Sequence, residues 1–203
     1  AAVAAEAAAG DRAIPDLPCR IRICDLGTCR DERHPPGAIV STRPYRAPEV
    51  MLGLGWMYAA DAWSMGCVVY EIATGRRLFD TRDTHAHLHL VEKTLGDPLP
   101  RHWASSCSEK TRPLFDADTG KLRPLIDSSI ARAGRARPIV EVIDDDADLR
   151  DLILRLLHVD PAQRLDPRRM AAHPYVDRHY PESLRHPVSE VRPEAVVCHP
   201  HWT

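Results

Sequence analysis

The chain has 203 residues, a formal net charge of −2 and 44% hydrophobic residues. This composition fits one globular domain, or a large piece of one, with enough apolar material for a core. The nearly balanced charge gives no reason to expect direct nucleic-acid binding, and no apolar run is long enough to cross a bilayer. The six cysteines stand in a long chain without a secretory signal, which favours free thiols and an intracellular location.

The N-terminal third of the chain is predicted to contain one strand and one long loop. Residues 1–18 are rich in alanine and are interpreted as a low-complexity insert or a truncated edge. Ile21 and Ile23 alternate with arginines, which predicts a half-buried strand ending at Asp25 and Gly27. Residues 28–46 show no period, and a loop of that length is usually functional or disordered.

Helices are predicted for most of the remaining chain. Residues 61–75 are apolar nearly all round, which predicts a buried central helix with Asp61 as its N-cap and Gly75 in a left-handed conformation after its end. A second helix is expected over residues 84–95, with Asp83 as a cap and Gly96 as the stop.

Two further helices are expected near the C-terminal end. Apolar residues between 149 and 157 have the spacing of an amphipathic helix. The acidic run at 144–148 is interpreted as capping and dipole complementation rather than a cation site. Asp166 and Pro167 predict the start of another helix, with Pro174 as its stop. The expected fold is mainly helical, with one strand-loop unit near the front.

Four motifs in order resemble the C-terminal lobe of a eukaryotic protein kinase. They are Asp-Leu-Gly at 25–27, Ala-Pro-Glu at 47–49, "DAWSMGCVVYE" from Asp61, and "DPAQR" ending at Arg164 and followed by "HPYV". "STRPYRAPEV" and "LGLGWMYAADAWSMGC" are similar to the CDC-like (LAMMER) dual-specificity kinases, and "HLHLVEKTLG" lies where that family has its LAMMER stretch. The resemblance covers roughly residues 19–176.

The resemblance implies a protein kinase-like fold, α+β overall, of which this chain is the mainly α-helical C-lobe. The expected organisation is an edge at 1–18, the lobe at 19–177 with its activation segment at 25–49, and a tail at 178–203. Asp25 would bind the Mg²⁺ that bridges the ATP phosphates. Cys24 would lie beside the nucleotide pocket, although a small core residue is the simpler interpretation.

Other site residues follow from the same resemblance. Thr42 would contact the catalytic acid, and Arg43 and Arg46 would lie beside the substrate and below the loop, with a purely structural role as the alternative. Glu49 and Arg164 would form a buried ion pair that pins the activation segment to the lobe.

Three departures from the kinase pattern affect the expected activity and its regulation. In the kinase pattern, Asp61 would hold the backbone of the catalytic loop. That loop carries a His-Arg-Asp motif, and no His-Arg-Asp precedes Asp25 in this sequence. Leu26 replaces the usual Phe, and Gly37 and Ala38 stand where CDC-like kinases tend to carry hydroxyls, so phosphorylation of this loop is not expected to order it.

The remaining parts of a kinase active site are also missing from the sequence. No Gly-x-Gly-x-x-Gly occurs, and none of the lysines, at positions 93, 110 and 121, lies on a candidate strand. Without the general base and most of the ATP site, the 203 residues are expected not to transfer phosphate alone.

The implied whole protein is a kinase that transfers the γ-phosphate of ATP to Ser/Thr, and as a dual-specificity enzyme also Tyr. The resemblance suggests Arg/Ser-rich protein substrates, a nuclear location and the N-lobe of the same kinase as partner. A non-catalytic kinase-like lobe that binds other proteins is the alternative. A helical zinc protein is a third, but the spacing of Cys19, Cys24 and Cys29, and of Cys198, His199 and His201, fits no usual zinc pattern.

Overall fold

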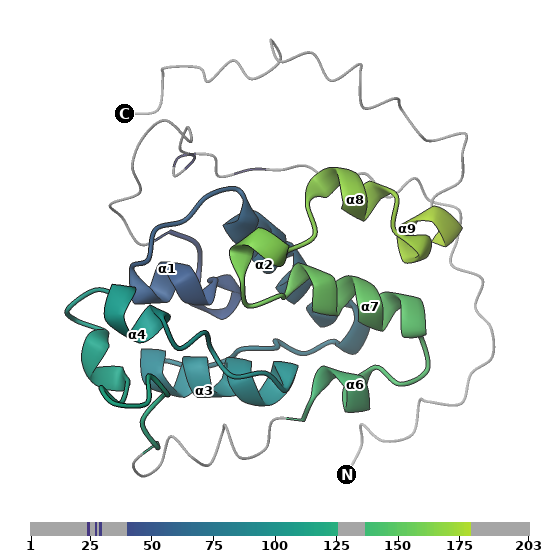
Figure 1. Ribbon diagram of the computed structural model, residues 1–203. Coiled ribbons are helices and arrows are strands. Elements are labelled where there is room, and N and C mark those ends of the chain that lie inside the picture. The colour runs from purple at the N-terminus through teal and green to yellow at the C-terminus, as the bar shows by residue number, and fades with distance from the viewer. Residues whose placement is uncertain (1–23, 25–26, 28, 30–39, 126–136, 180–203) are drawn as a thin grey trace. The chain divides into compact units, whose positions relative to one another are not determined.

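Helix α2, Ala59–Thr74, lies at the centre of the core. The computed structural model describes residues 24, 27, 29, 40–125 and 137–179 (Figure 1). The chain divides into two compact units between Asp31 and Glu32, and residues 40–125 and 137–179 belong to the second. On α2, Trp63 and Cys67 are at most 1% exposed, and Trp63 stacks on Phe79 with ring centroids 5.6 Å apart. Trp63, Cys67 and Phe79 belong to one hydrophobic core, which also contains buried residues from most of the other elements.

Helices account for the regular structure of residues 40–125 and 137–179. They are η2 Arg43–Tyr45, α1 Pro48–Leu52, α2, α3 Thr84–Leu95, α4 Trp103–Ser106, η3 Arg112–Leu114, α6 Ile139–Val142, α7 Ala147–Leu156, η5 Pro161–Gln163, α8 Pro167–Ala171 and α9 Pro174–His179. A single antiparallel bridge pairs Phe115 with Leu122. The expectation of a mainly helical lobe is confirmed. Most of the strand predicted before Gly27 lies outside the described residues.

The start of α2 differs from the prediction. Its N-cap is Tyr58 rather than Asp61. The N–H groups of Ala60 and Asp61 donate to the carbonyls of Met57 and Tyr58, at 2.9 and 3.0 Å, so that the helix begins one turn earlier. Asp61 is exposed in the first turn, where the helix dipole favours a carboxylate. The predicted end is confirmed, because Gly75 has φ 68° and donates to Glu71.

One face of α2 contradicts the expectation of a helix that other elements surround. Met65, Val68 and Ile72 are 44%, 39% and 79% exposed. Their i, i+3, i+7 spacing places them on the same side of the helix. We call these three residues the α2 stripe. Composition alone suggested burial all round, whereas the fold of this chain covers only the opposite side.

The other predicted helix ends are largely confirmed. The Asp83 carboxylate accepts a hydrogen bond from Ala86 N–H at 2.6 Å at the start of α3, and Gly96 follows its end with φ 82°. Asp146 and Asp166 cap α7 and α8 in the same way. Pro174 was predicted as a stop, but it begins α9, since the first helical position needs no N–H donor.

Helices α2 and α7 pack against each other (Figure 1). A Cβ atom placed on Gly66 would lie 2.9 Å from two side-chain carbons of Leu157, which is fully buried. The absence of a side chain therefore sets how near the two helices can come. A smaller cluster of Leu152, Leu156 and Leu165 extends the core towards α8 and α9. Among the described residues, no helix is both long and apolar enough to cross a membrane.

Candidate active-site segment

Glu49 and Arg164 form a buried, two-pronged ion pair. Arg164 Nη1 lies 2.6 Å from Glu49 Oε1, and Nη2 lies 2.7 Å from Oε2. Only 1% of the Arg164 side chain and 5% of the Glu49 side chain are exposed. The planar guanidinium matches the geometry of the carboxylate, which makes such pairs strong and directional. The predicted pair is present, and it joins the start of α1 to the segment after η5 across 115 residues of sequence.

The other N–H groups of Arg164 all find backbone acceptors. Nη1 also donates to Ala59 O at 2.9 Å, Nη2 to Val159 O at 3.1 Å, and Nε to His158 O at 2.7 Å. The guanidinium carbon lies 5.0 Å from the centre of the Trp63 ring. An arginine has five N–H donors, and here each one is used. Arg164 therefore ties α1, the first turn of α2 and the η5 loop to one point.

Arg46 fixes the backbone just before η2. Its Nη2 donates to Ser41 O at 2.6 Å and its Nε to Val40 O at 2.9 Å. Ser41 has φ 60°, a left-handed conformation that is uncommon for residues other than glycine. Burial, together with the nearby positive charge of Arg43, lowers the pKa of Arg46. These contacts support a structural role for Arg46 and leave its predicted proximity to substrate untested.

The η2 turn is held from two sides. Arg43 Nη1 donates to Thr84 Oγ1 at 3.2 Å at the start of α3. Tyr45 donates its hydroxyl to Glu71 Oε2 at 2.6 Å, and this hydrogen bond is the main reason that the pKa of Tyr45 is raised. Ser64 Oγ on α2 donates to Tyr45 O at 2.8 Å. Thr42, the N-cap of η2, makes no capping bond with its side chain. The predicted contact of Thr42 with the catalytic acid stays a prediction.

His87 is a residue near this segment that the sequence analysis missed. It is fully buried on α3, its Nδ1 lies 2.9 Å from Thr81 Oγ1, and its ring lies against Phe79. Burial, with smaller effects of Arg43 and Arg46, lowers the pKa of His87 to about 3. Its position one helical turn before Val91 on the buried face was the available signal.

The other predicted site residues have mixed outcomes. Asp25, the predicted Mg²⁺ ligand, lies outside the described residues, so its role stays a prediction. Cys24 and Cys29 are exposed within the described structure, and the position of Cys24 relative to the nucleotide pocket and the core of the lobe stays a prediction. Of the cysteines that the structure describes, Cys67 and Cys107 pack in the core, and burial raises the pKa of Cys67.

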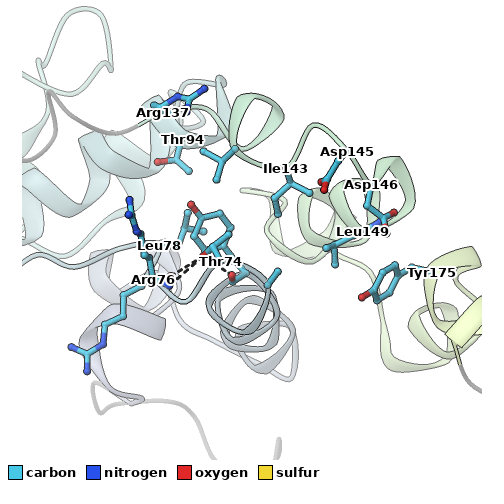
Figure 2. A pocket seen from close by; sticks show the side chains of 14 residues that line it. Thr74, Arg76, Leu78, Thr94, Arg137, Ile143, Asp145, Asp146, Leu149 and Tyr175 are labelled. Atoms are coloured by element: carbon cyan, nitrogen blue, oxygen red, sulfur yellow. Dashed lines mark hydrogen bonds between the residues drawn. The ribbon is translucent and has the colours of Figure 1, made fainter. Parts of the chain in front are cut away.

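A cleft of about 750 Å³ lies beside the C-terminal end of α2 (Figure 2). Figure 2 shows Thr74 and Arg76, from the end of α2, across from Ile143 and Leu149, with Tyr175 of α9 beyond them. None of the residues predicted for catalysis, metal binding or substrate contact lines this cleft. It is therefore not part of the candidate active site.

The order of the motifs, the helical lobe and the buried Glu49–Arg164 pair define one class of protein. A family model described as "Protein kinase domain" matches residues 14–176. The chain belongs to the protein kinase domain family. In a search of solved structures, it resembles a crystal structure of the kinase domain of PF14_0431, with a TM-score of 0.71 and 29% identity, over 77% of this chain and 47% of that one.

Within this family, the chain is similar to dual-specificity and serine/threonine kinases. It is 35% identical over 167 residues to "Dual specificity protein kinase lkh1" of Schizosaccharomyces pombe, covering 77% of this chain and 24% of that protein. It is 36% identical to "Serine/threonine-protein kinase AFC2" of Arabidopsis thaliana, covering 78% and 38%. It is 39% identical to "Dual specificity protein kinase CLK1" of Homo sapiens, covering 77% and 33%.

The chain spans about a quarter to two fifths of the length of these curated relatives. Protein kinases in general use ATP and Mg²⁺ and act on proteins. The similarity to CDC-like kinases confirms the resemblance seen in the motifs. For this chain itself, activity, substrates and partners are matters of proposal.

Proposed function

We propose that the chain is the C-lobe of a protein kinase that transfers the γ-phosphate of ATP to Ser/Thr, and also Tyr, of protein substrates. The substrate class that we propose is Arg/Ser-rich proteins of the nucleus, on the strength of the similarity to CDC-like kinases. The single observation that carries the proposal is the buried Glu49–Arg164 pair, with its 2.6 and 2.7 Å contacts at the end of the predicted activation segment.

The physical role of this pair is positional. In phosphoryl transfer the protein contributes mainly alignment and charge neutralisation, so the loop that receives the substrate must be held rigidly. Arg164 anchors Glu49 at the end of the loop, and Arg46 holds Val40 and Ser41 a few residues before it. A pure scaffold has less need for a loop fixed at both places.

Asp25 is the residue that we propose for Mg²⁺. A carboxylate is a hard oxygen ligand of the kind that Mg²⁺ prefers, and the bound ion would neutralise charge on the phosphates. Thr42 would contact the catalytic acid, and Arg43 would lie beside the substrate. The catalytic acid and the ATP lysine do not occur in the 203 residues, so we propose that these residues alone are inactive.

The α2 stripe supports a partner from the same kinase. Three large apolar side chains on a helix that is otherwise part of the core expose surface that favours burial. We propose that the upstream part of the kinase domain, which carries the N-lobe and the catalytic loop, covers this stripe in the whole protein.

The test is phosphotransfer by the intact gene product. We expect transfer of labelled γ-phosphate to an Arg/Ser-rich peptide, and loss of that transfer in Asp25→Ala. Asp118→Ala, at an exposed position in the hairpin after η3, is the matched control and should keep activity. Equal activity in wild type and Asp25→Ala would contradict the metal role.

The second candidate is a non-catalytic kinase-like lobe that acts as a protein-interaction module. Leu26 in place of the usual Phe favours it. The intact mass of the endogenous protein distinguishes the two. A mass well above 22.7 kDa, by about a whole N-lobe, supports the kinase, whereas a mass near 22.7 kDa supports the module. Binding of ATP by the intact protein would support the kinase, and absence of ATP binding would support the module.

A further inference from the structure

Two histidines on α3 converge on one backbone oxygen. His85 Nε2 and His89 Nε2 each lie 2.7 Å from the carbonyl oxygen of Arg123. The two rings are neighbours, with centroids 4.9 Å apart and planes at 55°. His85 and His89 are one helical turn apart, so both side chains leave the same side of α3. Arg123 belongs to the chain just after the Phe115–Leu122 bridge, far from α3 in sequence.

We propose that His85, His89 and the Arg123 carbonyl form a site for a divalent transition-metal ion of the kind that imidazole prefers, such as Zn²⁺. This site lies outside the predicted kinase machinery and does not depend on the proposed function. His-x3-His spacing on a helix gives two nitrogen ligands on one side of an ion.

The distances are near those that a metal requires. Metal–ligand bonds of about 2.0–2.2 Å at a tetrahedral angle separate the ligand atoms by about 3.4 Å, and at a right angle by about 3.0 Å. Each nitrogen now lies 2.7 Å from the oxygen. An ion would therefore need each imidazole to move outward by at least about 0.3–0.7 Å and to turn so that its Nε2 lone pair points at the ion instead of at the oxygen, a rotation that a half-buried side chain can make.

The metal-free arrangement explains how the site keeps its shape. A carbonyl oxygen has two lone pairs, so it can accept a hydrogen bond from each Nε2–H. On binding the ion, each neutral ring carries its proton on Nδ1 instead, and the Nε2 lone pair becomes the ligand. No proton is released when both rings start neutral. Both contacts lie in an exposed setting, so an ion can enter from solvent and water can complete its coordination.

Two charged side chains near the carbonyl, in the described part of the chain, are engaged elsewhere. The Arg123 guanidinium donates from Nε to Phe115 O at 3.0 Å, within its own hairpin. The Glu92 carboxylate, also on α3, accepts from Leu99 N–H at 2.9 Å and so belongs to the loop after the helix. The ligands are thus two imidazoles and one carbonyl. This set favours Zn²⁺, Ni²⁺ or Cu²⁺ over Mg²⁺ or Ca²⁺, which select oxygen ligands.

The experiment is calorimetric titration of the intact protein with Zn²⁺. We expect the double variant His85→Gln/His89→Gln to lose one bound equivalent, or at least about ten-fold in affinity at one site. Glutamine keeps an N–H donor for the Arg123 carbonyl but is a poor metal ligand. The hydrogen bonds that join α3 to the hairpin can therefore still form in the variant. The matched control is His158→Gln, an exposed histidine outside the pair, and it should bind like wild type.

Thermal unfolding supplies a second readout. Zn²⁺ should raise the melting temperature of wild type more than that of the double variant, because binding to the folded state alone stabilises it. Each single Gln variant should lose most of the effect, since the two rings act as one chelate. Unchanged stoichiometry and affinity in the double variant would overturn the proposal. Absence of Zn²⁺ binding by the wild-type protein would overturn it as well.

Discussion

At the residue scale, the single side chain of Arg164 contacts several separate segments of the fold. Its guanidinium contacts one carboxylate, three carbonyls and one indole ring, all inside the protein. Removing a charge from water is costly, and the mutual attraction of Glu49 and Arg164 offsets this cost only while both partners are present. The pair is therefore better described as a fixed anchor than as a source of net stability.

Replacing Arg164 with Met should lower the free energy of unfolding by about 3–5 kcal/mol, because Glu49 would remain buried without a partner. Urea denaturation of the variant and of wild type measures the difference. The control is Arg155→Met, whose ion pair with Asp151 is 2.8 Å long but 59% and 48% exposed. That change should cost less than about 1 kcal/mol. Similar losses in the two variants would contradict the anchoring role.

Protonation of His87 should make stability depend on pH. Its pKa is about 3 in the folded protein against 6.5 ordinarily, so between these values the unfolded chain binds more protons. The free energy of unfolding should therefore fall as pH decreases from about 6.5 towards 3, by at most about 1.4 kcal/mol per pH unit from this group.

The contribution of His87 is measured by comparing wild type with His87→Gln in the slope of unfolding free energy against pH. Acidic helix caps such as Asp146 and Asp166 have lowered pKa values and also lose their contribution in acid, so wild type alone does not isolate His87. His87→Gln should give a shallower slope of unfolding free energy against pH than wild type. The exposed His102, changed to Gln, is the control. Parallel slopes for wild type and His87→Gln would show that His87 does not carry the effect.

At the element scale, the contact of α2 with α7 depends on Gly66. Glycine is usually a poor choice inside a helix, where alanine would favour the helix by about 0.5–1 kcal/mol. Here the added Cβ would lie 2.9 Å from Leu157 and 3.0 Å from Leu156. Both leucines are at most 1% exposed, so neither can move aside into solvent.

Gly66→Ala should therefore lower the stability despite its better helix propensity. The expected net loss of unfolding free energy is about 1–2 kcal/mol, because the cost of the crowded Cβ exceeds the gain from the better helix propensity of alanine. Thermal or urea unfolding measures it. In the 203-residue chain, Val68→Ala, on the exposed side of the same helix, should change stability by no more than about 0.5 kcal/mol. A stabilised Gly66→Ala variant would mean that α2 and α7 separate more easily than this packing indicates.

At the scale of the whole molecule, the α2 stripe tests whether the chain is part of a larger domain. Ile72 is 79% exposed in this chain, so Ile72→Ser should change its unfolding free energy by no more than about 0.5 kcal/mol. In the intact kinase domain that we propose, the same change should cost about 1.5–3 kcal/mol, because Ile72 would be buried there. Equal, small effects in both proteins would exclude the stripe as an internal contact.

Several local features could be predicted from the sequence because their causes are local. Asp83 and Gly96 bound α3 as their chemistry requires, and Asp166 with Pro167 begins α8. Motif order predicted the kinase lobe and the pairing of Glu49 with Arg164, which are 115 residues apart. That pairing came from the family resemblance, since no spacing rule connects positions so distant.

Other features depend on which surfaces meet in three dimensions. The composition of α2 could not tell which of its apolar faces would be covered, and Met65, Val68 and Ile72 remain exposed. His87 and His89 lie two positions apart, yet one is buried in the core and the other reaches Arg123. The sequence by itself determined the family through the order of its motifs, the anchoring pair through the family resemblance, and several helix ends through local chemistry, whereas the start of α2 and the role of Pro174 differed from the prediction. Only the tertiary structure decided which side chains are desolvated and which distant groups touch, because burial is a property of neighbours that the chain brings together by folding.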